Sequence, residues 1–328
     1  MSPLAISLRS ALRLSMTGAE DSAFCCCAAL SAVALVAAAM VLPPSPPRPA
    51  HLDPAGAVLL ALGIAGLLLV LAQGPAWGWL SPLSVASGVL SVALLATWAA
   101  VELRARHPVI DLRLLRRRPV LAANVTAFLV AVGFYPLGPL VVRYVQTPPA
   151  VGYGFGAPVV VAGLMLTPFS LASFAAARVA RPLGQRGSAE LVVAGSCVLL
   201  IASMVLFGLA RDSYWQIVLA MALDGFGVGC VYAVNPLQIT SGVPAHETGS
   251  AISFYQLART VAYAIGSALS ATVLALSIPP GHAYPTYVGY GVAAAVCTAV
   301  LVMALLASGL FAAWRGPAGQ AAPEVAAS

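Results

Sequence analysis

Long apolar runs alternate with short polar or Pro- and Gly-rich breaks along almost the whole chain. A helix needs about 20 mostly apolar residues to cross the hydrocarbon core of a bilayer. Breaks such as PPSPPRPAHLDP and TSGVPAHETG carry turn-forming residues. The pattern therefore predicts an all-α polytopic membrane protein without a soluble domain of useful size. About nine transmembrane helices are expected, at residues 23–42, 54–73, 82–101, 119–142, 156–177, 189–210, 214–236, 249–277 and 286–314.

Composition supports this prediction and narrows the possible partners. Of 328 residues, 61% are hydrophobic and only 8% are charged, whereas a soluble domain is about 25% charged. The net charge of +6 would suggest nucleic acid in a soluble chain. Here the arginines lie in short loops where membrane topology explains them, so the expected partner is the lipid bilayer and not nucleic acid.

Catalytic and metal-binding chemistry has no recognisable signature in the chain. The six cysteines lie in or beside apolar runs without a CxxC pair, and the four histidines are scattered over four loops. No metal site and no cofactor are therefore expected. Nothing resembles a nucleophile, a general-base pair or an ATP site, so the protein is predicted not to be an enzyme.

Arginines are concentrated in alternate loops, which sets the expected orientation. The loop 102–118 is rich in arginine, and the loop two spans later carries Arg178, Arg181 and Arg186. Because positively charged short loops stay in the cytoplasm, these loops and the tail 315–328 are predicted to be cytoplasmic. The expected location is the inner (plasma) membrane, with several passes and a cytoplasmic C-terminus.

The N-terminus does not fit this orientation. Nine spans would place it outside, where Arg9 and Arg13 oppose the assignment. Three explanations stay open: the Ala- and Cys-rich first segment does not cross, it is a signal-like anchor, or helices that should precede it are missing. A misplaced start codon or a truncated gene is the favoured interpretation.

Four stretches together resemble a known transporter family. HLDPAGAVLLALGIAGLLLVLAQGPAWGW (51–79) begins with Asp-x-x-Gly and ends with Gly-x-x-Trp-Gly-Trp. RHPVIDLRLLRRRPVLAANVTAFL (106–129), the basic turn FAAARVARPLGQRGS (174–188) and VPAHETGSAISFYQLART (243–260) with its Gln-x-x-Arg follow in order. In order and spacing they resemble the later part of the 14-helix drug:proton antiporter branch of the major facilitator superfamily.

The resemblance implies a division of the chain. An irregular segment, 1–22, would precede three transmembrane helices in 23–101, one from the N-terminal bundle and two central. The Arg-rich cytoplasmic linker 102–118 would lead into a C-terminal six-helix bundle, 119–314, followed by the tail 315–328. The first five helices of such a transporter would be absent, so the chain is expected to be N-terminally truncated.

The resemblance also implies a function. It predicts a transporter of the major facilitator type that exports drugs or small molecules, with protons as the coupling ion. The basic loop residues Arg178, Arg181, Arg186 and Gly187 are then candidates for cytoplasmic gating. The alternative is a non-transporting remnant or a membrane interaction module that lacks the first bundle.

Two ionisable residues inside predicted spans are the main site candidates, because such residues mark transport paths by default. Asp224 lies about ten residues into one span and Arg259 about ten into the next, so each is roughly 15 Å deep. They are hypothesised to pair across the helix interface or to face a shared aqueous cavity. A salt bridge that only fixes helix packing is the equally weighted alternative.

Helical spacing places further polar side chains beside these two. Gln256 and Tyr263 share a stripe with Arg259, and Asn235 and Gln238 share a side of their helix with Asp224. Asn124, near the start of the fourth span, is a further candidate for lining the path. Separately, Gly225 and Gly229 form a GxxxG pattern, which predicts close helix packing in the membrane.

Overall fold

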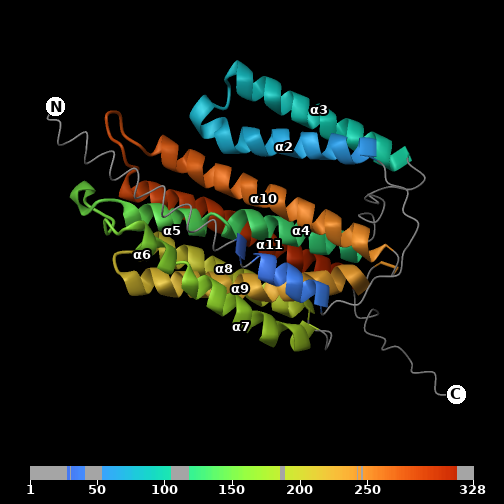
Figure 1. Cartoon of the computed structure of the whole chain (residues 1–328). Helices are drawn as coiled ribbons and strands as arrows, with labels where there is room; N and C mark the ends of the chain where they lie inside the picture. Colours follow the sequence, from blue (N-terminus) through green and yellow to red (C-terminus); the bar gives the residue numbers. More distant parts are fainter. Residues whose placement is uncertain are drawn as a thin grey trace. The chain divides into compact units, whose positions relative to one another are not determined.

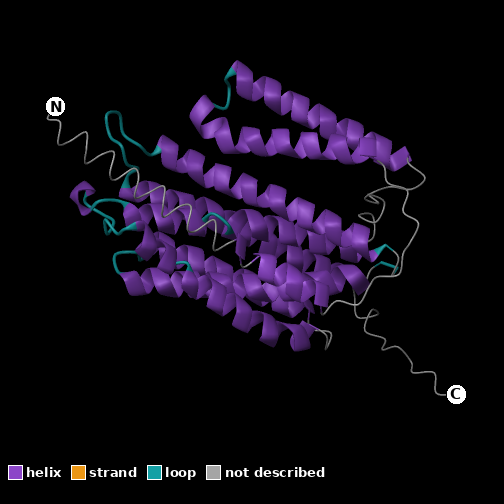
Figure 2. Ribbon diagram, viewed as in Figure 1, coloured by secondary structure: helices purple, strands orange, loops and turns teal. Residues whose placement is uncertain are grey.

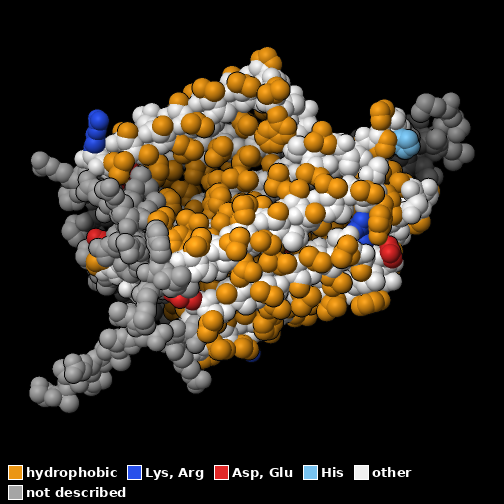
Figure 3. All heavy atoms as spheres, turned by 180° about the vertical axis from the view of Figure 1, so that it is seen from behind, with side chains coloured by type: hydrophobic (Ala, Val, Ile, Leu, Met, Phe, Trp, Pro, Cys, Tyr) orange, Lys and Arg blue, Asp and Glu red, His pale blue; other side chains and the backbone are white. Residues whose placement is uncertain are grey.

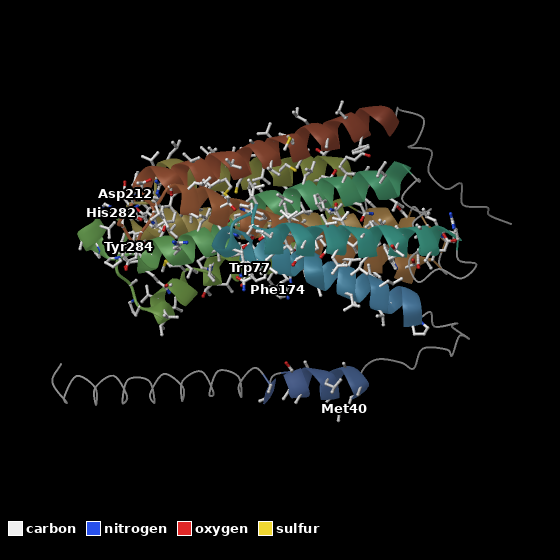
Figure 4. The ribbon with its side chains drawn as sticks, turned by 90° about the horizontal axis from the view of Figure 1, so that it is seen from above. Met40, Trp77, Phe174, Asp212, His282 and Tyr284 are labelled. Carbon is white, nitrogen blue, oxygen red and sulfur yellow. The ribbon has the colours of Figure 1, made fainter. Side chains whose placement is uncertain are left out.

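The computed structural model describes residues 28–29, 31–40, 54–104, 118–184, 189–241, 243–244 and 247–315. The chain divides into two compact units, 1–51 and 52–328. Within the first unit the structure describes the short apolar helix Ser31–Met40, with Met40 labelled in Figure 4. The architecture below is that of the second unit.

Helices and short connections make up the described part of the second unit, and no strand occurs in that part (Figure 2). One 3₁₀ turn, Pro149–Val151, lies in a connection. The helices, labelled in Figure 1, are α2 (Pro54–Trp77), α3 (Pro82–Arg104), α4 (Arg118–Phe134), α5 (Leu137–Gln146), α6 (Val159–Leu164), α7 (Thr167–Leu183), α8 (Ala189–Leu209), α9 (Tyr214–Ser241), α10 (Thr248–Leu276) and α11 (Tyr287–Arg315).

Eight stretches of the described chain are long and apolar enough to cross a membrane. They coincide with the last eight of the predicted spans, and this confirms an all-α polytopic membrane protein. The described part of the first predicted span, 23–42, contains the helix Ser31–Met40. That helix is about half as long as a crossing requires.

Two spans predicted as continuous helices are each built from two pieces. The span predicted at 119–142 consists of α4 and α5, which meet at Tyr135 and Pro136. The span predicted at 156–177 consists of α6 and α7, and α7 has a proline in its first turn. Proline has no backbone N–H to donate and its ring clashes with the preceding turn, so the helical ladder is interrupted at these points.

Helix α9 lies at the centre of the bundle and packs against α7, α8 and α4, while α4 also packs against α10 and α11. Helices α2 and α3 form an antiparallel hairpin beside α10 (Figure 1). The indole Nε1 of Trp79, after α2, donates to Thr272 Oγ1 of α10 at 3.1 Å. The connections α8–α9 and α10–α11 share one end of the bundle, where Figure 4 labels Asp212 and His282.

The surface of the protein is mainly apolar, as expected for a chain that lies in lipid. Hydrophobic side chains cover most of the face shown in Figure 3, and most charged side chains on it lie toward the two ends. Exposed large apolar residues are frequent on α2, α3, α7 and α11. In a bilayer this exposure costs nothing, because lipid tails are as apolar as the side chains themselves.

Helices α7 and α9 approach at backbone distance through two glycines. A Cβ atom on Gly225 would overlap the carbonyl oxygen of Phe169, and one on Gly229 would overlap that of Ser173. Both partner residues belong to α7. The GxxxG prediction of close helix packing is therefore confirmed, and the close approach provides the dispersion contacts that hold helices together in lipid.

The substitution Gly225→Ala is expected to lower the free energy of unfolding by about 1 to 3 kcal/mol, because the added methyl forces the two helices apart. Gly195→Ala on α8 is the matched control, since a Cβ there meets nothing within 4 Å and alanine favours helix. Thermal unfolding of both variants in detergent measures the difference. Equal midpoints for the two variants would contradict the packing role of Gly225.

Candidate transport site

Arg259 of α10 lies among tyrosine rings. Its guanidinium carbon is 4.3 Å from the ring centre of Tyr232 of α9, 5.5 Å from that of Tyr255 and 5.8 Å from that of Tyr263. Residues four apart share one face of a helix, so Tyr255 and Tyr263 lie one turn to either side of Arg259. Aromatic faces attract a cation, and they stabilise the half-buried guanidinium.

More aromatic rings extend this group onto two other helices. Phe134 ends α4, packs parallel to Phe169 of α7 with 6.3 Å between ring centres, and meets Tyr263 edge-on at 5.8 Å. Tyr135 stacks on Tyr263 with ring centres 4.6 Å apart, and the hydroxyls of Tyr232 and Tyr263 hydrogen-bond. We call the following residues the aromatic cluster: Phe134, Tyr135, Phe169, Tyr232, Tyr255 and Tyr263.

Asp224 does not pair with Arg259, so the hypothesised contact between them is corrected. No ion pair between them is present in the described chain, and Asp224 Oδ1 and Arg259 Nε each lack a hydrogen-bond partner. Their depths were counted from opposite helix ends, but α9 has 28 residues and α10 has 29. Arg259 is level with Tyr232, which is about 12 Å along α9 from Asp224.

The Asp224 side chain lies inside the bundle, about 12 Å along α9 from Tyr232. It is 2% exposed, and its charge would act on the Cys297 thiol of α11. Cys297 is also buried. Asp224 is therefore an acid without an ionic partner in the described chain, at a place where an ionised carboxylate is costly.

The remaining predicted path residues separate into two groups. Asn235 is fully buried and lies beside the Tyr255 hydroxyl, next to Arg259. Gln256 is exposed on α10. The other two lie away from the cluster: Gln238 lines a small cavity with Thr126 and Glu190, and Asn124 donates to the Val120 carbonyl of its own helix at 2.8 Å.

Comparison with known proteins identifies the family. The family model described as Major Facilitator Superfamily matches residues 21–267, which is more than half of the chain. The chain belongs to the major facilitator superfamily. The resemblance inferred from its loop motifs is thereby confirmed.

Relatives of this superfamily member carry resistance names. It is 31% identical to the tetracycline resistance determinant of Streptomyces rimosus, over 61% of this chain and 57% of the relative. It is 26% identical to the multidrug resistance protein Stp of Mycobacterium tuberculosis, over 70% of this chain and 42% of the relative. It is 25% identical to the multidrug export protein EmrB of Haemophilus influenzae, over 67% of this chain and 42% of the relative. The chain spans about half the length of these relatives.

A crystal structure of a mutant of the nucleoside transporter NupG aligns with 76% of this chain. The alignment covers 65% of the NupG chain, with a TM-score of 0.48 and 14% sequence identity. The family assignment and the apolar helices make the chain a multi-pass membrane protein, and its bacterial relatives indicate the plasma membrane.

The basic loop of this superfamily member is described in part. Arg178 is exposed on α7, with its guanidinium 4.3 Å from the ring centre of Phe174. Arg181 is exposed in the last turn of the same helix. Arg186 and Gly187 lie outside the described residues.

Sequence reasoning missed most of the aromatic cluster, although signals for it were present. Tyr255 is four residues before Arg259, and Tyr263 is four residues after it. Helical spacing therefore places Tyr255 on the same polar stripe as Arg259 and Tyr263. Tyr232 is three residues before Asn235 and therefore on a neighbouring position of the same side. Pro136 indicated a helix break that brings Tyr135 to the surface, where it is 39% exposed.

A second arginine, Arg211, is buried just after the C-terminus of α8. It is 1% exposed. Its Nη1 donates to the carbonyls of Phe207, at 3.0 Å, and Gly208 in the last turn of α8. Its Nη2 donates to the carbonyl of Tyr287 at 2.6 Å, and the guanidinium lies 3.9 Å from that ring's centre. Arg211 thus joins the C-terminus of α8 to the N-terminus of α11.

Arg211→Ala is expected to lower the free energy of unfolding by about 2 to 3 kcal/mol, because buried carbonyls lose charged donors. Arg143→Ala is the control, since Arg143 is exposed in the last turn of α5, and its effect should stay within about 0.5 kcal/mol. Denaturant unfolding in detergent measures both. A loss of the same size in the two variants would show that the buried contacts of Arg211 contribute little.

Proposed function

We propose that the chain takes part in proton-coupled efflux of drugs or other small molecules, with Arg259 and the aromatic cluster forming one wall of the substrate path. One observation carries the proposal: side chains from α4, α7, α9 and α10 converge on a charged residue about 16 Å from the start of α10. Substrate sites of secondary transporters lie near the middle of the membrane.

Two further observations support an efflux function. Relatives that share 25 to 31% identity are named for tetracycline or multidrug resistance and for drug export. The cluster combines rings, hydroxyls and one cation, and binding sites for small organic molecules are lined mainly by apolar and aromatic groups with a few polar ones.

Asp224 is the proposed binding site for the coupling proton. An unpaired carboxylate is expensive to bury, whereas the neutral acid costs far less. The Asp224 carboxyl would therefore take up a proton when the site is closed and release it when the site meets water. Because Asp224 is about 12 Å along α9 from the level of Arg259, proton and substrate would occupy separate places.

The proposal extends to the organisation of the chain. The arginine-rich linker 102–118, the exposed arginines of α7 and the tail 315–328 would face the cytoplasm. Arg178 and Arg181 would then take part in gating at that side, together with Arg186 and Gly187. The helices from α4 to α11 would form the C-terminal bundle of the transporter.

The test uses the full chain in proteoliposomes with an imposed pH gradient, with tetracycline and ethidium as trial substrates. Gradient-driven flux of at least one of the two compounds is expected in the wild type. It should fall at least tenfold in Asp224→Asn, because an amide cannot take up and release the proton. Flux is measured from the fluorescence of each compound, together with that of a pH dye inside the vesicles.

The matched control is Asp212→Asn, because Asp212 is exposed in the α8–α9 connection. Flux by this variant should stay within about twofold of the wild-type flux. Wild-type flux from Asp224→Asn would refute the coupling role of this residue. Absence of gradient-driven flux of both compounds in the wild type would refute transport by this chain and favour a membrane interaction module.

A further inference from the structure

The charge balance at the aromatic cluster is unusual for the interior of a membrane protein. Buried arginines in membranes normally pair with an acid or with backbone carbonyls, as Arg211 does. In the described part of the chain, Arg259 pairs with no carboxylate, and its Nε has no hydrogen-bond partner. Asp224, the nearby acid of α9, does not reach it. The site therefore carries one positive charge that no described carboxylate neutralises.

Rings already occupy the faces of this cation. Tyr232, Tyr255 and Tyr263 all lie within 5.8 Å of the guanidinium carbon. An organic cation that entered the cluster would have to displace Arg259 from these rings while being repelled by it. An anion meets the opposite situation, because the guanidinium fork can donate two parallel hydrogen bonds to a carboxylate.

An accessible ring stands next to this charge. Tyr135 is 39% exposed and stacks with its neighbour Tyr263 at a 19° angle between ring planes. Tyr263 in turn lies beside Arg259. The guanidinium carbon is 5.8 Å from the Tyr263 ring centre, and that centre is 4.6 Å from the Tyr135 ring centre, so a single ring separates the hydrogen-bond donor from the exposed aromatic face. Offset stacking on such a face favours planar rings.

From this arrangement we infer that the substrates are planar aromatic anions, whose carboxylate or ionised hydroxyl binds Arg259 while their rings stack on Tyr135. This assignment rests on the proposed function and adds the chemical class of the substrate to it. Arg259 selects the charge of the substrate, and the aromatic cluster selects its shape.

The experiment compares three probes that share one ring system and differ in charge. Anthracene-9-carboxylate is the anion, its amide is neutral, and anthracen-9-ylmethyl-trimethylammonium is the cation. Binding to the full chain in phosphatidylcholine nanodiscs is followed by anthracene fluorescence, and the zwitterionic lipid adds no net charge. The carboxylate is expected to bind at least tenfold more tightly than either of the other probes.

Variants identify which side chains produce this order. Arg259→Gln should remove the preference for the carboxylate, and Arg259→Lys should retain part of it because lysine keeps the charge but not the fork. Tyr135→Ala should weaken the binding of all three probes by a similar factor and leave the order of their affinities unchanged. Arg143→Gln, an exposed arginine of α5, is the charge-matched control and should behave as the wild type.

Several outcomes would overturn the assignment: equal or tighter binding of the cation by the wild type, or an unchanged carboxylate preference in Arg259→Gln that elutes as a folded protein. If Arg259→Gln does not fold, Arg259→Lys together with Tyr135→Ala decides the same question. Anion preference without gradient-driven flux would refute the proposed function alone. Flux of tetracycline and ethidium without anion preference would refute the substrate class alone.

Discussion

Close backbone contact at glycines is the constraint on which the rest of the bundle depends. In lipid, helices gain nothing from hiding apolar side chains, so they associate through short-range dispersion contacts. Gly225 and Gly229 bring α9 against α7. Gly266 brings α10 against α4, where a Cβ would overlap the carbonyl oxygen of Val132. These crossings fix which faces of α4, α7, α9 and α10 meet, and so they place the aromatic cluster.

The same lack of water decides how each charged group behaves. Arg211 has its charge distributed over carbonyls at a helix end and over the Tyr287 ring, so it acts as a structural joint. Arg259 has rings beside it but no described acid, and this is why we propose it as the group that binds a ligand. Asp224 has neither kind of partner. Three ionisable groups in one bundle thus have three different surroundings.

The family assignment and the geometry support each other at the level of the helices. A major facilitator transporter works by moving bundles around a site near the middle of the membrane, and in this chain Arg259 and the aromatic cluster lie about 16 Å along α10 from its first residue. The broken pairs α4–α5 and α6–α7 also fit such a site. Phe134 and Tyr135 lie directly at the first break, where the interrupted helix lets a ring turn toward the neighbouring helices.

The sequence by itself determined the fold class, the last eight spans and the family, because apolar runs of bilayer length and loop arginines are local properties of the chain. It also identified Arg259 and its stripe, since helical spacing fixes which residues share a face. It could not determine which stripes meet. Asp224 and Arg259 were placed at one level by counting from helix ends, and only the real lengths of α9 and α10 showed that Tyr232 occupies that level instead. The tertiary structure decided the partners of each polar group, because contacts between helices depend on where glycines let the backbones approach.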